Sequence, residues 1–173
     1  MVDWYKVKAR HGDADLWVLR RSQQEPQVAG TPWRLEDGTS VYDLIIEDRF
    51  AEIPFDFWFE PDSGHRGTRR GDMLWTTGTT KIASTAMVEV LRQVGATGWS
   101  TFPVDLRDRD GAPIEGYTGL SVHSNDAQDD LNQIFEDHNF TFLARPHVIE
   151  ALRAAGADAL DIEEFDPADY DDV

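Results

Sequence analysis

Short runs of apolar residues alternate with polar turns in the first part of the chain, which we delimit as residues 1–74. Residues 4–8, 16–19 and 41–46 are β-prone runs, and polar or proline-containing stretches separate them. Residues 61–72 are rich in Gly, Asp and Arg and form the clearest loop in the sequence. The pattern therefore predicts a strand-rich first part.

An aromatic segment follows the third run. Phe55, Phe57 and Phe59 fall on one face of an expected strand, because side chains alternate between the two faces of a strand. Core packing and an aromatic ligand surface are both compatible with this spacing, and the core is the simpler interpretation.

The pattern changes to a helical period after residue 84. Ser84 is a candidate N-cap, the apolar residues that follow it have helical spacing, and Gly95 ends the pattern. Residues 88–96 recur in similar form 61 positions later as residues 149–157, where Pro146 occupies the first turn. We expect two principal helices, near residues 84–95 and 146–156, each followed by a glycine and a strand.

The segment between these helices predicts a β-hairpin. Residues 99–106 alternate apolar and polar positions, the Asp110-Gly111 pair suits a tight turn, and residues 117–123 form a second strand. Farther on, residues 129–138 predict a short amphipathic helix that begins at Asp129.

The expected fold class is α+β, a single domain over residues 1–173 with a mixed, mainly antiparallel sheet and two main helices. Within it, residues 75–165 hold the helix–strand–hairpin and helix–strand units, and residues 166–173 form an acidic tail.

The net negative charge of the chain is concentrated in its second half. The chain has 33 acidic and 16 basic residues, a net charge of −17. Residues 105–173 hold 18 acidic and four basic side chains, so they carry −14 of that charge. Nucleic acid and anionic membranes repel such a chain, and direct binding to either is not expected. A solvated surface, a halophilic host and a face that docks a basic protein all account for the acidity.

The sequence offers few residues for chemistry. The chain has no cysteine, and its five histidines show no metal-ligand spacing, so we expect no cofactor and no catalytic metal. Arg66, Arg69 and Arg70 form the one basic cluster, either as a phosphate clamp, as solvated arginines or as internal partners of acidic residues. The chain lacks an apolar run long enough to span a membrane and a signal-peptide pattern at its start, so we expect a cytoplasmic protein.

Several short motifs between residues 84 and 123 stand in a characteristic order. They are residues 84–91, Gly95-Ala96-Thr97-Gly98-Trp99, Phe102-Pro103-Val104-Asp105-Leu106, Asp110-Gly111 and Gly116-Tyr117-Thr118-Gly119-Leu120-Ser121-Val122. This segment resembles small bacterial proteins related to the myxobacterial immunity protein family of polymorphic toxin systems, with its double-CxxCG relatives. Phe142-Leu143 and residues 149–160 resemble the C-terminal unit of the same proteins, so that the resemblance covers residues 75–165.

The resemblance implies a non-enzymatic protein that binds and neutralises a cognate toxin. The cysteines of the CxxCG relatives are absent here, and Ala159 stands where those proteins have a second glycine. Two alternatives remain open: a small enzyme whose site gathers His123, Arg66 or Arg70 with acidic residues from several loops, and an acidic mimic of nucleic acid.

The partner surface is expected near the C-terminus, where acidic and aromatic residues mix. An acidic face accelerates association with a basic toxin domain, and a desolvated aromatic side chain supplies affinity. The candidate residues are Asp161, Glu163, Glu164, Phe165, Asp166 and Tyr170. The competing interpretation is that Phe165 is the last core residue of its strand.

Overall fold

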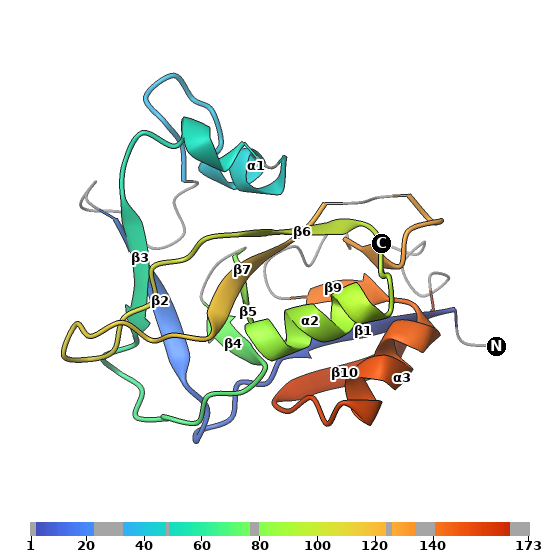
Figure 1. Ribbon diagram of the computed structural model, residues 1–173. Helices are drawn as coiled ribbons and strands as arrows, with labels where there is room; N and C mark the ends of the chain where they lie inside the picture. The colour runs from blue at the N-terminus through green and yellow to red at the C-terminus, as the bar shows by residue number, and fades with distance from the viewer. Residues whose placement is uncertain are drawn as a thin grey trace.

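The computed structural model describes residues 3–22, 33–47, 49–76, 80–123, 126–133 and 141–166 (Figure 1). The helices are α1 (Val41–Ile46), α2 (Thr85–Gln93), α3 (Pro146–Ala154) and a 3-10 turn, η1 (Phe50–Glu52). The strands are β1 (Trp4–Ala9), β2 (Trp17–Ser22), β3 (Phe57–Pro61), β4 (Met73–Thr76), β5 (Lys81–Ser84), β6 (Trp99–Phe102), β7 (Tyr117–Val122), β8 (Leu131–Asn132), β9 (Thr141–Ala144) and β10 (Leu160–Phe165).

The strands form two sheets. One has four strands in the order β10-β1-β9-β8, and the other has six in the order β3-β2-β4-β5-β7-β6. All the pairings between these strands are antiparallel except that of β2 with β4. The predicted α+β class with two main helices is confirmed, and the strands divide between two sheets.

Both principal helices begin and end where their sequence signals predict. The Ser84 side chain accepts a hydrogen bond from the backbone N–H of Met87 at 3.0 Å, which caps α2. α3 begins at Pro146, which has no N–H to leave unsatisfied in the first turn. Gly95 and Gly156 then adopt positive φ angles of 71° and 75°, which end the two helices.

The sequence repeat corresponds to two half-units of the same architecture. The first half-unit is β4, β5, α2 and β6, with β7 inserted between β5 and β6. The second is β8, β9, α3 and β10, with β1 inserted between β9 and β10. β1 precedes the first half-unit in the chain but is inserted in the second. β7 precedes the second half-unit in the chain but is inserted in the first. We call this arrangement the strand exchange.

Backbone contacts at the two inserted strands match each other. The N–H of Arg10, after β1, donates to the carbonyl of Ala159 at 2.8 Å, and the N–H of His123, after β7, donates to the carbonyl of Gly98 at 3.2 Å. Gly98 and Ala159 occupy equivalent places before β6 and β10, and both have positive φ, at 84° and 59°. Ala159 therefore takes a backbone conformation that glycine takes in the other half-unit.

An aspartate before each half-unit holds the helix–strand loop of the other. Asp72 accepts a hydrogen bond from the N–H of Asp158 at 2.7 Å. Asp130 accepts one from the N–H of Thr97 at 3.1 Å, and Leu131 donates its own N–H to the Thr97 carbonyl at 3.0 Å. Through these reciprocal contacts, each half-unit is hydrogen-bonded to the helix–strand loop of the other.

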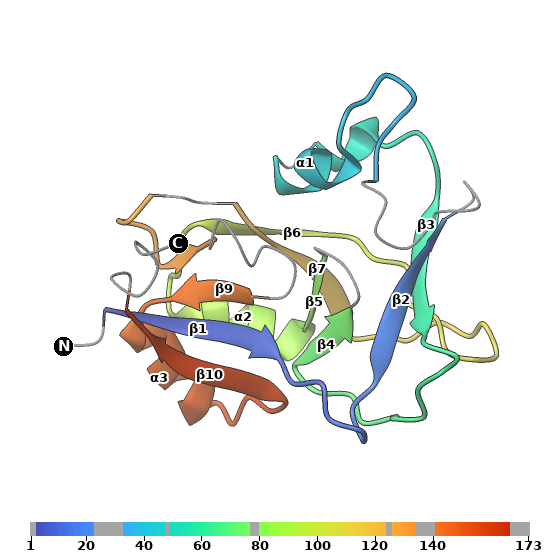
Figure 2. The same ribbon diagram turned by 180° about the vertical axis from the view of Figure 1, so that it is seen from behind.

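The main core lies between the four-stranded sheet, the six-stranded sheet and the two long helices. Figure 2 shows β1 and β10 in front of α2 and α3. Equivalent positions of the two helices contribute to this core: Met87, Val88 and Leu91 from α2, and Val148, Ile149 and Leu152 from α3. A second core, which includes Val18, Phe59 and Ile82, lies under α1, and Figure 1 shows α1 well apart from the other two helices.

The prediction of a β-prone run at residues 41–46 is wrong, because this segment forms α1. Ser40 accepts a hydrogen bond from the N–H of Asp43 at 3.2 Å and caps the helix. Val41, Leu44 and Ile45 are buried and have the i, i+3, i+4 spacing of a helical stripe. Because the run is rich in β-branched residues, which favour strands, its composition outweighed this helical spacing in the sequence-based prediction.

Two further boundaries differ from expectation. The predicted helix start at Asp129 is wrong: Asp129 lies in a turn before β8, and residues 134–138 of that predicted helix lie outside the described residues. The strand expected over 99–106 ends at Phe102, because Pro103 has no N–H for a sheet ladder. The hairpin itself is confirmed, with Phe102 opposite Gly119 in the β6–β7 pair.

Candidate functional site

The candidate partner-binding residues lie on β10 and at its end. Glu163, Glu164 and Asp166 are exposed, whereas Asp161 and Phe165 are half-buried. Tyr170, the sixth candidate, lies outside the described residues. The structure thus brings five of the candidates onto one strand and the residue after it.

β10 is an edge strand. Within the described part of the chain it pairs with β1 on one side, and no strand pairs with it on the other. The outward-facing N–H and C=O groups of an edge strand form hydrogen bonds with an added strand when one is available. Charged side chains such as Glu163 and Glu164 oppose unselective pairing of this edge.

The acidic side chains divide between the two faces of the sheet. Asp161 and Glu163 lie on the face that also presents Lys8 and Lys6, which are their cross-strand partners in β1. Lys8 Nζ lies 3.6 Å from Glu163 Oε1. Two of the three lysines in the chain therefore face these acids, and the charge on this face is partly neutralised.

Glu164 differs from this pair, because it faces Tyr5 across the β1–β10 ladder rather than a lysine. Asp166 follows the last paired residue of β10. Both carboxylates are exposed at the end of the edge strand, where a basic partner can reach them.

Phe165 packs in a small cluster outside the main core. Its neighbours are Trp4 and Leu143, both buried, on the face of the sheet away from α3. The guanidinium of Arg145 covers the Trp4 ring at 3.9 Å. Phe165 is therefore an apolar residue at the strand end that is half-buried and adjoins Glu164 and Asp166.

The arginine cluster acts largely within the protein. Arg69 Nε donates to the carboxylate of the buried Asp15 at 2.7 Å, and Arg70 pairs with Asp108 at 3.1 Å. Burial raises the pKa of Asp15, but hydrogen bonds from Arg69, the Gly12 N–H and Arg10 outweigh it and hold the pKa below its usual value. Of the interpretations that the sequence left open, internal pairing describes Arg69 and Arg70.

Sequence reasoning missed an aromatic–histidine cluster at the start of β2. The His65 ring stacks on Trp17 with centroids 3.8 Å apart and planes 5° from parallel, and its Nε2 donates to the Asp15 carbonyl at 2.8 Å. Trp75 and the exposed His11 adjoin the same tryptophan. Because these rings come from distant parts of the chain, no local pattern signals the cluster.

The residues of the alternative enzyme site come from two segments: His123 follows β7, and Arg66 and Arg70 lie in the loop of residues 61–72. His123 is exposed, and no side-chain hydrogen bond or ion pair in the described part of the chain joins it to Arg66 or Arg70. Among the described residues no group of three or more His, Asp or Glu side chains is placed to hold a metal ion. The helices of that same part are too short or too polar to cross a membrane.

Comparison of the chain with models of protein families and with curated proteins finds no match in either set. The function proposed for this protein therefore depends on its own sequence and structure.

Proposed function

We propose that this chain is a non-enzymatic binding protein that captures a basic protein partner along β10, and that it is an immunity protein that neutralises a toxin. One observation carries the proposal: an edge strand with an acidic end and an adjacent aromatic side chain. The family resemblance over residues 75–165 supplies the toxin as the kind of partner. We also propose a cytoplasmic location, which suits a chain without cysteine.

Strand addition is the mode of binding that this surface supports. An extended segment of the partner pairs with the free edge of β10, and main-chain hydrogen bonds supply part of the affinity. Lysine and arginine side chains of that segment meet Glu164 and Asp166, while an apolar side chain packs on Phe165. Long-range attraction by the net charge of −17 steers a basic partner toward the protein.

The test first examines the genes beside that of this chain for a secreted protein with a toxin-like C-terminal domain. It then measures the association rate of that domain with this protein by stopped flow at several salt concentrations. Replacing Glu164 with Gln and Asp166 with Asn should lower the association rate by about tenfold at low salt and flatten its salt dependence. The matched control replaces Glu89 and Glu150, exposed residues on α2 and α3, with Gln.

Equal rates for the β10 variant and the helix variant would place the partner elsewhere and contradict the edge-strand proposal. Failure of the unmodified protein to bind or inhibit the neighbouring domain would contradict the immunity function itself. Circular dichroism of each variant checks that the fold is intact.

A further inference from the structure

The register of β1 and β10 determines which backbone groups of β10 bond to β1. The N–H of Arg10 donates to the Ala159 carbonyl at 2.8 Å, at the pair that directly precedes β10. In an antiparallel ladder, every second residue of a strand directs its N–H and C=O toward the same neighbour. The residues that bond to β1 are therefore Asp161, Glu163 and Phe165. The residues whose N–H and C=O point away from β1 are Leu160, Ile162 and Glu164.

The other edge of the same sheet shows what an outward backbone group does. The N–H of Arg145 donates to the Asp130 carbonyl at 2.9 Å, so the N–H of Leu131, the next residue of β8, points away from β9. It donates to the Thr97 carbonyl at 3.0 Å. Along β10, the described part of the chain supplies no such acceptor for the outward groups.

The three outward-bonding residues of β10 have their side chains on one face of the sheet, because side chains alternate along a strand. Leu160 and Ile162 pack against the main core but are only half-buried, so part of each apolar side chain is exposed at the edge. Glu164 ends this row and is exposed. On this face an added strand therefore meets two apolar side chains and then a carboxylate.

On the opposite face, the acids of β10 already have basic neighbours. Asp161 and Glu163 lie opposite two lysines of β1. Lys8 Nζ lies 3.6 Å from Glu163 Oε1. The residues of an added strand that face this side therefore need no particular charge.

The equivalent edge in the other half-unit is β6, and it differs at one position. The N–H of His123 donates to the Gly98 carbonyl at 3.2 Å, so by the same rule the outward residues there are Trp99, Thr101 and Pro103. Pro103 stands where β10 has Glu164, and it has no N–H to donate. The β6 edge therefore lacks both the third main-chain donor and the carboxylate.

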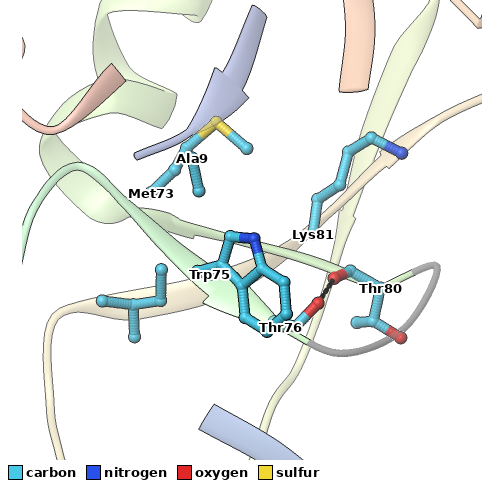
Figure 3. A pocket seen from close by; sticks show the side chains of 7 residues that line it. Ala9, Met73, Trp75, Thr76, Thr80 and Lys81 are labelled. Carbon is cyan, nitrogen blue, oxygen red and sulfur yellow. Dashed lines mark hydrogen bonds between the residues drawn. The ribbon is translucent and has the colours of Figure 1, made fainter. Parts of the chain in front are cut away.

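Two cavities that adjoin β5 are too small to compete with the β10 edge as a place for a partner. Each has room for about one water molecule. Figure 3 shows the first, where the Thr76 hydroxyl donates to the Thr80 carbonyl at 2.6 Å and the buried Lys81 points away from Trp75. Neither cavity admits a side chain of a partner.

We propose that the partner docks as an extended segment antiparallel to β10, with the sequence pattern basic-x-apolar-x-apolar. Its basic residue lies opposite Glu164, its apolar residues lie opposite Ile162 and Leu160, and its main chain bonds to the outward groups of these residues. The pattern rests on the proposed function, which supplies a basic protein as the partner. Pro103 restricts docking to β10, so one segment binds to each chain.

Amide hydrogen exchange of the full chain, measured by NMR, tests this register. In the free protein the outward amides of Leu160, Ile162 and Glu164 should exchange about tenfold faster, or more, than the other amides of β10. The probe is a synthetic peptide with blocked ends and the central sequence Lys-Ser-Val-Thr-Val. It should slow exchange at the three outward amides and leave the amides of Trp99 and Thr101 unchanged.

A reversed peptide and three variants supply the controls. The reversed sequence Val-Thr-Val-Ser-Lys has the same composition and charge and should bind about tenfold more weakly, because its lysine then lies opposite Leu160. Glu164→Pro removes one outward N–H and should also weaken binding about tenfold, whereas Glu164→Gln keeps the N–H and should weaken it less. Thr101→Pro, at an outward position of β6, should leave binding unchanged.

Equal exchange along the whole of β10, equal binding of the two peptides, or protection of Trp99 and Thr101 in place of β10 would each overturn the docking pattern. If the peptide binds as expected but the toxin-like domain is not bound, the docking pattern stands and the immunity function fails. If the domain is bound and inhibited but the peptide protects no outward amide, the docking pattern fails and the function stands. Should Glu164→Pro not fold, the exchange measurements on the unmodified protein decide the question.

Discussion

Single buried charges set the tightest constraints on this fold. Asp15 is 3% exposed and joins the first loop of the chain to the arginine loop, because it accepts hydrogen bonds from the Gly12 N–H, Arg10 and Arg69. Gly67 is required beside it: a Cβ at that position would lie 2.0 Å from the Asp15 carbonyl oxygen. Both the side chain and the backbone of Asp15 therefore contact the loop of residues 61–72 and fix its position.

Replacing Asp15 with Asn should lower the free energy of unfolding at pH 7 by about 2 kcal/mol, since two guanidinium groups lose their buried acceptor. The hydrogen bonds hold the folded pKa of Asp15 below its unfolded value, so the carboxylate stabilises the protein fully above the unfolded pKa. This contribution disappears as pH falls through the folded pKa. Urea unfolding should show a large loss of stability for Asp15→Asn at pH 7 and a small loss near pH 2.

Asp108→Asn is the control for this prediction, because Asp108 pairs with Arg70 at an exposed site. Its cost should be about 0.5 kcal/mol or less. A loss in Asp15→Asn no greater than that of the control would show that the Asp15 pairs add nothing to stability.

Helix ends were the elements most readily predicted from the sequence. Ser84, Gly95, Pro146 and Gly156 act through contacts within a few residues, so local pattern suffices to place them. The same reasoning failed at α1, a six-residue helix that depends on the burial of Val41, Leu44 and Ile45, of which Val41 and Ile45 belong to the second core. It also failed at β8, whose extended form depends on the distant Thr97 loop.

The two equivalent helices differ in their caps, and this difference predicts unequal sensitivity. Ser84→Ala should lower the free energy of unfolding by about 1 kcal/mol or more, because the side chain caps α2 and its hydroxyl also donates a hydrogen bond to Asp72. Arg145, at the same place before α3, forms no side-chain cap. Thr85→Ala, one residue farther and exposed, is the control and should cost about 0.5 kcal/mol or less. Chemical denaturation measures both, and equal losses would contradict a capping role.

Candidate site residues were predictable only in part. The acidic and aromatic residues of β10 are visible in the sequence, as is the alternation that makes a strand. That Lys6 and Lys8 face Asp161 and Glu163 is not visible, because the β1–β10 pairing joins the two ends of the chain. The outward direction of the Leu160, Ile162 and Glu164 backbone groups likewise follows from that pairing.

At the scale of the whole molecule, the strand exchange makes the two half-units one domain. β1, from the first half of the chain, lies between β9 and β10 of the second half. β7, which follows the first half-unit in the chain, lies between β5 and β6 of that half-unit. The main core accordingly takes residues from both halves. A sequence repeat predicts the two helix–strand units, but it does not reveal which strand completes which unit.

Division of the chain tests this interdependence. Fragments 1–111 and 112–173, separated at the exposed turn that Gly111 forms, should each be largely unfolded when produced alone. Mixed or co-expressed, they should form a one-to-one complex with the circular dichroism spectrum of the intact protein. Size-exclusion chromatography and circular dichroism measure both states. Cooperative thermal unfolding of either isolated fragment would contradict the prediction.

The strand exchange also determines when the protein is able to fold during its synthesis. β1 leaves the ribosome first, but both of its neighbours, β9 and β10, are made at the other end of the chain. At ordinary rates of translation β1 waits on the order of ten seconds for them. Throughout that interval both edges of β1 and the apolar side chains of Val7 and Ala9 lack their native cover. The four-stranded sheet therefore closes only after β10 has left the ribosome, and until then the first strand is open to pairing with other proteins.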